Sequence, residues 1–384
     1  MLKRIVFIAI ASLLPAACDS EGPITPDEFA PGAVFTMTNA AARNEVVSFA
    51  RGSDGSLTEM GRFDTGGRGS GEPRLGSQGP MTLSADNQWL LVANVGSDDI
   101  SVFRVSSGGG LALVDVQNSG GDAPYSITIH QDLVFVLNNG GPGNVTGFNL
   151  APTGQLAPVE GATAPLSQSG GTNPGQVLFS PNGRAVVVTE KATNRLTTYR
   201  VDGDGLLTGP LVHESSGLTP FGGAFTRSGT YLVTEAHEGA PGLAATSSYA
   251  LTGDANLEGI SGTVQSGETD VCWTLITQDD DFAFVTNFGS GTISSYRIAG
   301  DGSIQVQEPI AARTSSGQGP RDHGLTSDGQ LLYVIEIGFE DSPSLPDGPT
   351  GIFGYEVQAD GGLVEIGVFA EGRLPDTIAG LAAF

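Results

Sequence analysis

Residues 90–105, LLVANVGSDDISVFRV, contain the phrase from which the fold of this chain can be worked out. A run of strand-forming residues ends at Asn94, a polar loop follows, and a second strand-forming run contains an aromatic residue. The phrase recurs at 33–50, 134–150, 186–201, 231–251, 283–298 and 332–357. Seven copies spaced about 50 residues apart are typical of a β-propeller, in which each unit is one blade of several strands.

We therefore predict an all-β chain that forms a seven-bladed β-propeller of four-stranded blades over residues 33–384. The 57 Gly and 22 Pro residues, together with only 15% charged residues, agree with a turn-rich β protein that has little or no helix. One blade cannot bury both of its faces. Seven blades in a ring can, and the ring encloses a central channel.

The two ends of the chain are expected to complete one blade together. Residues 33–38 read as a second strand with no first strand before it, whereas LPDTIAGLAAF at 374–384 reads as a first strand with nothing after it. Pairing these segments closes the ring with strands from both termini. Closure removes the exposed edges that an open sheet would present.

The segment 1–18 reads as an export signal rather than as part of the propeller. Two basic residues precede the apolar stretch 5–14, and Cys18 ends the segment. Ten apolar residues are too few to cross a bilayer. The segment resembles a bacterial lipoprotein signal, which implies lipidation of Cys18. The alternative is ordinary cleavage near Ala17.

Residues 19–32 are rich in proline and acids and are predicted to form a flexible tether between the lipid and the propeller. Loss of the two basic residues of the signal changes the formal net charge from −25 to −27. Such a surface repels nucleic acid and anionic lipid head groups. We expect an exported monomer, lipid-anchored in the cell envelope and facing the periplasm or the exterior. It would bind no nucleic acid and contact the membrane only through its N-terminal lipid.

Cys272 is the one cysteine outside the signal, so no disulfide within the mature chain is expected. It lies in VCWTLIT, which reads as a strand. No basic residue lies within ten positions of it to lower its pKa. The interpretation is a buried, inert thiol.

The polar residue that ends the first strand run of each repeat occupies an equivalent position in every blade, so these residues should form a ring at one rim. They are Asn39, Asn94, Asn138, Glu190, Glu235, Asn287 and Glu336. One interpretation is structural, because Asn and Glu at strand ends satisfy backbone groups of the following turn. The other is a polar basin of acid–base groups, or a site for Ca²⁺ or Mg²⁺. Without a dense metal motif, we expect no cofactor.

Four longer loops are predicted on that same rim, where function usually resides. They are Thr65–Gly79, Ala164–Gln176, His237–Thr246 and Phe339–Gly351. The segment 317–329 also places Arg321 and His323 at the entrance of a channel-lining strand. Arg is a ligand for carboxylates and oxyanions, and His titrates near neutral pH. The candidate catalytic residues are Arg321, His323, Glu190, Glu336 and Glu235. The candidate substrate-binding residues are Arg74, His237, Asn287 and Asn94.

These phrases resemble those of the seven-bladed lactonase-type propellers, which include 6-phosphogluconolactonase-like and carboxymuconate-cyclase-like proteins. The resemblance covers residues 33–384, and GPRDH at 319–323 is similar to the family's Pro-Arg element. It implies that Arg321 is a ligand for a substrate carboxylate. Family members often have His after the Pro that enters a channel strand. This chain has Met81, Tyr125, Gly175 and Phe221 at those positions.

Two functions from different classes remain open. The first is a lactone hydrolase or lactonising isomerase that acts on a small lactone or organic acid. The second is a non-catalytic propeller that binds a protein or polysaccharide of the envelope, because FVTNFGSGTISSYRI at 284–298 also resembles the repeat of cell-surface binding propellers. Export and strong negative charge argue against a phosphorylated sugar lactone as the substrate.

Overall fold

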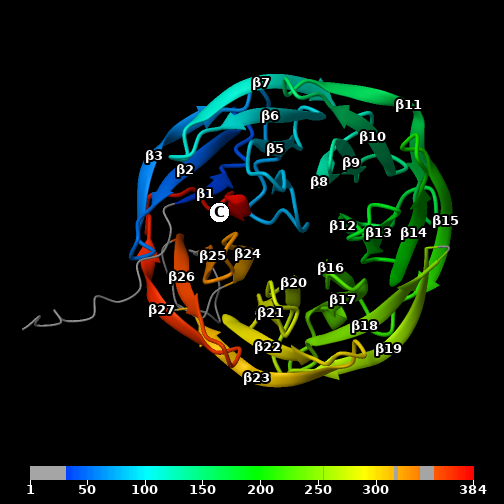
Figure 1. The fold of residues 1–384 in the computed structure, drawn as a ribbon, viewed down its shortest axis with the longest axis vertical. Coiled ribbons are helices and arrows are strands. Elements are labelled where there is room, and N and C mark those ends of the chain that lie inside the picture. Colours follow the sequence, from blue (N-terminus) through cyan, green and yellow to red (C-terminus); the bar gives the residue numbers. More distant parts are fainter. Residues whose placement is uncertain (1–31, 254, 315–318, 338–349) are drawn as a thin grey trace, which may run out of the picture.

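The computed structural model describes residues 32–253, 255–314, 319–337 and 350–384. Seven antiparallel sheets of four strands each are arranged in a ring around a central channel (Figure 1). The predicted all-β, seven-bladed propeller is therefore confirmed. The predicted export signal, the lipidation of Cys18 and the tether lie outside the described residues, except for the last residue of the tether, Gly32, which begins the first strand.

The blades are numbered in chain order, and the strands of each are given from the channel outward. Blade 1 consists of β28 (Ala379–Ala383), β1 (Gly32–Met37), β2 (Glu45–Arg51) and β3 (Leu57–Asp64). Blade 2 consists of β4 (Met81–Leu83), β5 (Trp89–Asn94), β6 (Asp99–Val105) and β7 (Leu111–Asn118). Blade 3 consists of β8 (Pro124–His130), β9 (Leu133–Asn138), β10 (Asn144–Leu150) and β11 (Leu156–Pro165).

The remaining four blades follow the same order. Blade 4 consists of β12 (Pro174–Phe179), β13 (Ala185–Glu190), β14 (Arg195–Val201) and β15 (Leu207–Glu214). Blade 5 consists of β16 (Pro220–Phe225), β17 (Thr230–Glu235), β18 (Ala245–Thr252) and β19 (Asn256–Gln265). Blade 6 consists of β20 (Val271–Ile276), β21 (Phe282–Asn287), β22 (Thr292–Ile298) and β23 (Ile304–Arg313). Blade 7 consists of β24 (Pro320–Leu325), β25 (Leu331–Glu336), β26 (Gly351–Val357) and β27 (Leu363–Phe369).

The hydrophobic pattern of each strand follows its distance from the channel. All six residues of β5 are buried, because the second strand of a blade has a neighbouring blade on each face. The outer strand β3 instead alternates between buried or half-buried and exposed residues, the pattern of a strand with one face in water. Uninterrupted apolar runs in the sequence therefore mark the second strands.

The chain termini close the ring as predicted. Strand β28 pairs with β1 in antiparallel register, with Phe35 opposite Ala382 and Thr36 opposite Leu381. The backbone also exchanges hydrogen bonds between Ala33 and Phe384, at 3.0 Å in each direction. Blade 1 thus takes its innermost strand from the end of the chain and its other three from the beginning.

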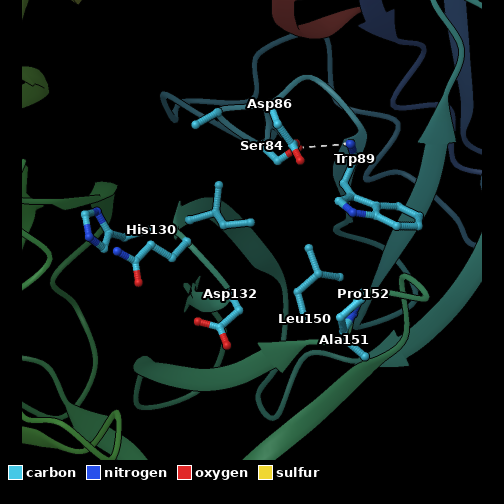
Figure 2. A pocket seen from close by; sticks show the side chains of 11 residues that line it. Ser84, Asp86, Trp89, His130, Asp132, Leu150, Ala151 and Pro152 are labelled. Carbon is cyan, nitrogen blue, oxygen red and sulfur yellow. Dashed lines mark hydrogen bonds between the residues drawn. The ribbon is translucent and has the colours of Figure 1, made fainter.

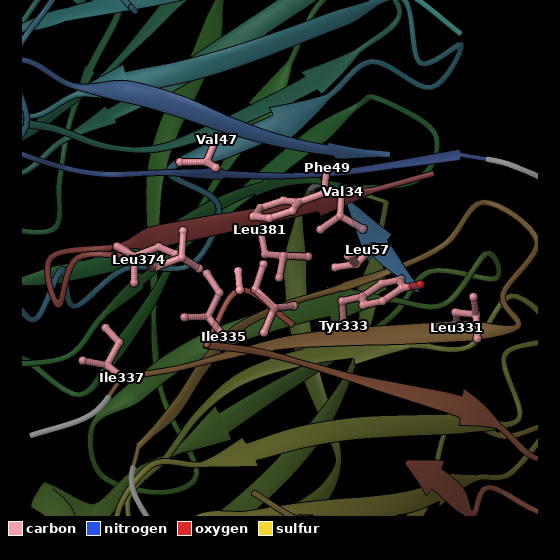
Figure 3. Close-up of a cluster of buried hydrophobic side chains, with 13 residues drawn as sticks. Val34, Val47, Phe49, Leu57, Leu331, Tyr333, Ile335, Ile337, Leu374 and Leu381 are labelled. Carbon is pink, nitrogen blue, oxygen red and sulfur yellow. The ribbon is translucent and has the colours of Figure 1, made fainter. Parts of the chain in front are cut away.

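The apolar core lies between adjacent blades rather than in one central mass. At the closure, Val34 and Phe49 of blade 1 pack with Tyr333 of blade 7 and with Leu381 of the closing strand (Figure 3). The Tyr333 hydroxyl donates a 2.7 Å hydrogen bond to the Gly55 carbonyl of blade 1. Fully burying a side chain of this size stabilises a fold by about 1.5–3 kcal/mol.

The aromatic residue in the third strand of the repeat joins one blade to the one before it. The Tyr199 hydroxyl of blade 4 donates to the Pro165 carbonyl of blade 3 at 2.7 Å. Tyr296 of blade 6 makes the equivalent bond to the Val264 carbonyl of blade 5 at 3.0 Å. Because the ring of each tyrosine is buried, its hydroxyl needs such a partner. The repeated aromatic in the sequence is therefore an inter-blade contact.

Connections on one face join each outer strand to the inner strand of the next blade, and we call this the top face. The predicted loop Thr65–Gly79 lies there, between β3 and β4. Segment 164–176 is shorter than predicted, because β11 and β12 extend into both of its ends. Most of Phe339–Gly351 lies outside the described residues. Within the described ranges, the only helical segment is one 3₁₀ turn at His237–Gly239, and no helix there is long and apolar enough to cross a membrane.

Deleting the last ten residues should unfold the domain rather than trim it. The deletion removes β28 and with it the buried side chains of Ile378 and Leu381. It also exposes the pairing edge of β1. The apolar loss alone, about 1.5–3 kcal/mol for each large side chain, takes up much of a typical net stability of about 5–15 kcal/mol. Circular dichroism during urea unfolding measures the effect.

Leu381→Ala is the matched control, because it keeps the strand and removes one buried side chain. It should cost about 2–5 kcal/mol and leave a cooperative transition. A truncated chain that unfolds cooperatively at the midpoint of the intact protein would contradict the closure argument.

Candidate functional site

The inner strands of the blades turn side chains into the channel through bulges. In β16, β20 and β24 the pairing with the second strand skips two residues near the top end of the strand. A bulge leaves its extra residues unpaired and re-aims their side chains. The residues skipped are Phe221 and Gly222, Cys272 and Trp273, and Arg321 and Asp322. Single-residue skips place Tyr125 and Gly175 at the same level of β8 and β12.

The loop Thr65–Gly79, which we call the plug loop, reaches across the channel at this level. Its Gln78 side chain donates to the Thr274 carbonyl at 2.7 Å and accepts from the Thr274 amide at 3.1 Å. The indole of Trp273 donates to the Ser77 carbonyl at 3.0 Å. The Gln78 amide donates to the Gly175 carbonyl at 2.9 Å. A loop that starts in blade 1 is therefore held by blades 4 and 6.

Arg321 is the most distinctive side chain of the channel. It is only 2% exposed, yet none of its three guanidinium nitrogens has a hydrogen-bond partner among the described residues. Its guanidinium lies over the Phe288 ring, 5.4 Å from the centroid, and that of Arg74 lies 4.9 Å from the same centroid. Burial lowers the pKa of Arg321 to about 10, so it remains charged at neutral pH. A buried charge without hydrogen bonds is costly unless a ligand completes it.

Asp322 and His323 line a small cavity of about 160 Å³ in the channel, together with Gln78 and Gln176. Asp322 is 4% exposed, and its Oδ2 has no hydrogen-bond partner in the described ranges. Both ring nitrogens of His323 are also enclosed without a partner there. Burial raises the pKa of Asp322 to about 6 and lowers that of His323 to about 4. Near neutral pH the pair is a carboxylate and a neutral imidazole, and both can accept a proton.

A second buried cation, Lys191, lies in the channel wall. It follows the end of β13, is 7% exposed, and donates a hydrogen bond to the Gly76 carbonyl of the plug loop. The thiol of Cys272 is buried nearby, and burial raises its pKa well above the usual range. The predicted burial of this thiol is confirmed, and its inertness stays a prediction. The fold nevertheless brings Lys191 and Arg321 to it, although no basic residue is near it in the sequence.

The structure places Glu190 in the wall between blades 3 and 4. Its carboxylate accepts four hydrogen bonds, from the Ser167 amide at 2.9 Å, the Ser167 hydroxyl, Thr193 at 3.0 Å and Thr197 at 2.7 Å. Ser167 lies just beyond the outer strand of blade 3. Through the bonds to Ser167, Glu190 links blade 4 to blade 3. Its assignment as an acid–base group stays a prediction.

The other predicted residues of the ring are buried in similar positions. Asn94 accepts from Thr65 at 2.8 Å, and Asn287 donates to Thr292 at 3.0 Å. Glu235 accepts from the Gly217 amide at 2.7 Å. Glu336 is 1% exposed and lies opposite Pro320 in the sheet register, one residue before Arg321.

Two predicted site residues of blade 5, Glu235 and His237, are brought together. A side chain on Gly217 would contact both the Glu235 carboxylate and the Nε2 atom of His237, so these two groups face one small space. His237 and Glu238 both adopt positive φ angles, of 48° and 56°. Burial raises the pKa of Glu235, and hydrogen bonds partly offset that effect.

The opposite face carries separate grooves. One, of about 530 Å³, lies between the β4–β5 and β8–β9 turns, with Trp89 on one side and His130 on the other (Figure 2). Its acids, Asp86 and Asp132, lie in the β4–β5 and β8–β9 turns, at the opposite ends of the inner strands from the bulges. Among the described residues, no group of three or more His, Cys, Asp or Glu side chains is arranged to hold a metal.

Sequence reasoning missed Lys191, Asp322 and the bridging role of Gln78. One signal was present for Lys191. The chain has two lysines, and Lys191 is the only one beyond residue 3. It also directly follows a residue of the predicted ring. Nothing local distinguishes Gln78, because its partners lie 196 residues away.

The stated resemblance to lactonase-type propellers is confirmed by comparison with known proteins. Residues 40–164 match the family model of the lactonase, 7-bladed beta-propeller. Uncharacterised proteins of Staphylococcus aureus strains USA300 and N315 are 27% identical over 160 residues. That match covers 40% of this chain and 44% of theirs, so it spans less than half of those relatives.

Solved structures share the fold over nearly the whole chain. A putative 6-phosphogluconolactonase from Bacteroides uniformis has a TM-score of 0.69 at 16% identity, over 92% of this chain and 99% of that one. The periplasmic gluconolactonase of Pseudomonas aeruginosa has a TM-score of 0.68 at 15% identity, over 92% and 99%. At these identities the similarity establishes the propeller fold.

Asp322 and His323 should make the free energy of unfolding depend on pH in opposite directions. The raised pKa of Asp322 stabilises the folded state below about pH 4, and this effect disappears as the pH rises through about 6. The lowered pKa of His323 stabilises above about pH 6.5, and this effect disappears as the pH falls through about 4. The two contributions therefore oppose each other across the same range.

Single substitutions separate the two groups. The stability gained by Asp322→Asn should be about 3 kcal/mol larger at pH 7 than at pH 4, because a shift of about two pKa units is removed. His323→Gln should show the reverse order. Urea unfolding followed by tryptophan fluorescence at both pH values measures each gain. Equal gains from Asp322→Asn at the two pH values would show that burial does not control this carboxyl group.

Proposed function

We propose that this protein is a lactone-processing enzyme of the cell envelope, a lactonase or lactonising isomerase, whose carboxylate-bearing substrate binds in the central channel. The observation that carries the proposal is Arg321, a buried guanidinium with no hydrogen-bond partner among the described residues. Such a group fits a planar anion, which accepts two parallel hydrogen bonds from it. The family match and the gluconolactonase fold neighbours support the reaction class.

The charge distribution favours a small anion inside an otherwise acidic molecule. The formal net charge of the chain is −25, but the bulge level of the channel contains the buried cations Lys191 and Arg321. The guanidinium groups of Arg74, in the plug loop, and of Arg321 lie over the same aromatic ring, that of Phe288. A multiply charged phosphorylated sugar would be repelled by the outer surface more strongly than a monocarboxylate.

The proposed chemistry uses Asp322 and His323, which line the 160 Å³ cavity, and Arg321, which directly precedes them in β24. In lactone hydrolysis a water molecule attacks the carbonyl carbon, and negative charge develops on the carbonyl oxygen. Arg321 stabilises that charge or anchors a neighbouring carboxylate, and its effect is large because the guanidinium is buried. Asp322 or His323 takes the proton from the water and returns it to the ring oxygen as the ring opens. Glu190, Glu235 and Glu336 are the other candidate acids, and the four bonds to Glu190 favour the first pair.

Substrate entry requires the plug loop to move. A cavity of about 160 Å³ is smaller than the roughly 300 Å³ at which ligand sites usually begin. The loop contains Gly66, Gly71 and Gly79 with φ angles of 79°, 74° and 76°, a backbone conformation that glycine adopts at low cost. These positions suit hinges of a loop that opens over the channel.

The envelope location in this proposal rests on the sequence of residues 1–18, which reads as a lipoprotein signal with Cys18 as the lipidated residue. The fold neighbour from Pseudomonas aeruginosa, described as a periplasmic gluconolactonase, supports an extracytoplasmic lactone substrate.

One observation favours the alternative, a non-catalytic propeller that binds an envelope protein or polysaccharide. The plug loop occupies the channel and bonds to blades 4 and 6, so the rim rather than the channel would meet a ligand. Under this alternative, changes at Arg321 would leave binding intact.

Arg321→Met should lower kcat/KM for the best lactone substrate by about 10²–10³-fold, the usual effect of losing one oxyanion donor. Proton release by the full chain is followed across sugar lactones and lactones of dicarboxylic acids. Arg321→Lys should recover little, because an ammonium group cannot make the two parallel bonds of a guanidinium.

Arg297→Met provides the matched control, because Arg297 also lies over a phenylalanine ring, at 5.2 Å from the Phe282 centroid, but on an exposed part of blade 6. Its turnover should equal that of the unmodified protein. Absence of turnover across the panel, or equal rates for Arg321→Met and the unmodified protein, would reject the lactone proposal and favour the binding role.

A further inference from the structure

Lys191 has no part in the lactone chemistry proposed above, and its surroundings suit a different reaction. It is the only lysine beyond residue 3, and it lies 7% exposed at the channel wall. It forms no ion pair with any acid in the described part of the chain. Among the described residues, its ammonium group donates one hydrogen bond, to the Gly76 carbonyl of the plug loop. A buried lysine is normally paired with a carboxylate, so this one calls for another explanation.

The ammonium group of Lys191 is surrounded by aromatic rings and a thiol instead of a carboxylate. The Lys191 Nζ atom lies 4.5 Å from the Phe221 ring centroid and 5.8 Å from that of Tyr125. Cys272 packs with Phe221 in the same apolar cluster. Burial lowers the pKa of Lys191 to about 8, so about a tenth of the molecules carry a neutral amine at pH 7. A desolvated lysine next to other cations is the usual form of an amine nucleophile.

The same cluster also determines which ligand charge fits. Phe221, Cys272 and Trp273 are buried together, with Phe288 packed against them. Lys191 lies over the Phe221 ring, while Arg321 and Arg74 lie over the Phe288 ring. Two acids, Asp270 and Asp322, act on the enclosed thiol. The unmet guanidinium donors of Arg321 in this cluster suit one further carboxylate.

We propose that Lys191 is a covalent capture site for a small oxo acid, whose carbonyl forms an imine with Nζ and whose carboxylate faces the arginines. The amine lone pair attacks the carbonyl carbon, and the electrons of the C=O π bond move to oxygen to give a carbinolamine. The oxygen then leaves as water with the two amine protons, and a C=N bond remains. The sum is amine plus carbonyl to imine plus water, so no oxidant or reductant is required.

Imine formation has a consequence for the plug loop. A neutral imine nitrogen carries no hydrogen and cannot donate to the Gly76 carbonyl, whereas Lys191 does so in the free protein. Capture of an oxo acid therefore removes one of the bonds that hold the loop over the channel. The site does not depend on the proposed lactone reaction, because it uses a different reacting atom.

Trapping the imine tests the proposal. The full chain is incubated with glyoxylate and sodium cyanoborohydride in the presence of a lysine-containing reference peptide, and digests are analysed by mass spectrometry. We expect Lys191 to acquire the reduced glyoxylate adduct at least tenfold faster than the peptide lysine. In guanidinium chloride this preference should disappear. Native protein in which Lys191 is unmodified, or is modified no faster than the peptide, would overturn the proposal.

Two comparisons test the anionic part. Propanal, an uncharged aldehyde of similar size, should label Lys191 at least tenfold more slowly than glyoxylate, and equal rates would overturn the assignment to oxo acids. Lys191→Arg keeps the charge and should abolish the adduct while circular dichroism stays unchanged. Hydrogen exchange at residues 72–79 should increase when glyoxylate is added without the reductant, because the unreduced imine has no hydrogen to donate to Gly76, but not in Lys191→Arg treated in the same way. Unchanged exchange in the protein treated with glyoxylate alone would overturn the link to the plug loop.

Discussion

The pairing of β28 with β1 is the interaction on which the rest of the molecule depends. Each blade buries its faces only against its two neighbours, so an unclosed blade 1 would leave apolar surface open on both sides of the gap. The pairing joins residues more than 330 positions apart, as the hydrogen bonds between Ala33 and Phe384 illustrate. Because the inner strands form the channel wall, the same pairing fixes the positions of all residues that face the channel.

The repeated polar residues at the ends of the second strands illustrate how one sequence pattern supports two interpretations. Asn94 and Glu190 occupy equivalent positions, and each bonds to a residue just beyond the outer strand of the preceding blade. That is the inter-blade role expected of polar groups at strand ends. The residues of greatest chemical interest occur instead one strand inward, where bulges release Arg321 and Asp322 from the sheet pairing.

The channel combines features that an acidic, turn-rich chain would not suggest. Two cations are buried there, one on β24 and one after β13, and both lie over aromatic rings; neither forms an ion pair within the described residues. Aromatic faces attract cations only moderately, by about 0.5–2 kcal/mol, and do not satisfy their hydrogen-bond donors. The unmet guanidinium donors of Arg321 are the basis of the anionic ligand that we propose for this region.

The fold followed from the sequence because the repeat is local. A phrase of about 16 residues with a hairpin turn specifies two paired strands, and seven copies specify the ring. The pairing of the two termini could also be predicted, because residues 33–38 lack a first strand and residues 374–384 form a first strand with nothing after it. The sequence also indicated Arg321 and His323 through the segment that enters a channel strand. It did not indicate that Lys191 meets Phe221, because a bulge in the next blade positions that ring, or that Gln78 bonds to Thr274, which lies 196 residues away. Periodicity fixes what each blade repeats, whereas the bulges and the path of one long loop determine which side chains meet across the ring, and those contacts exist only once the ring has closed.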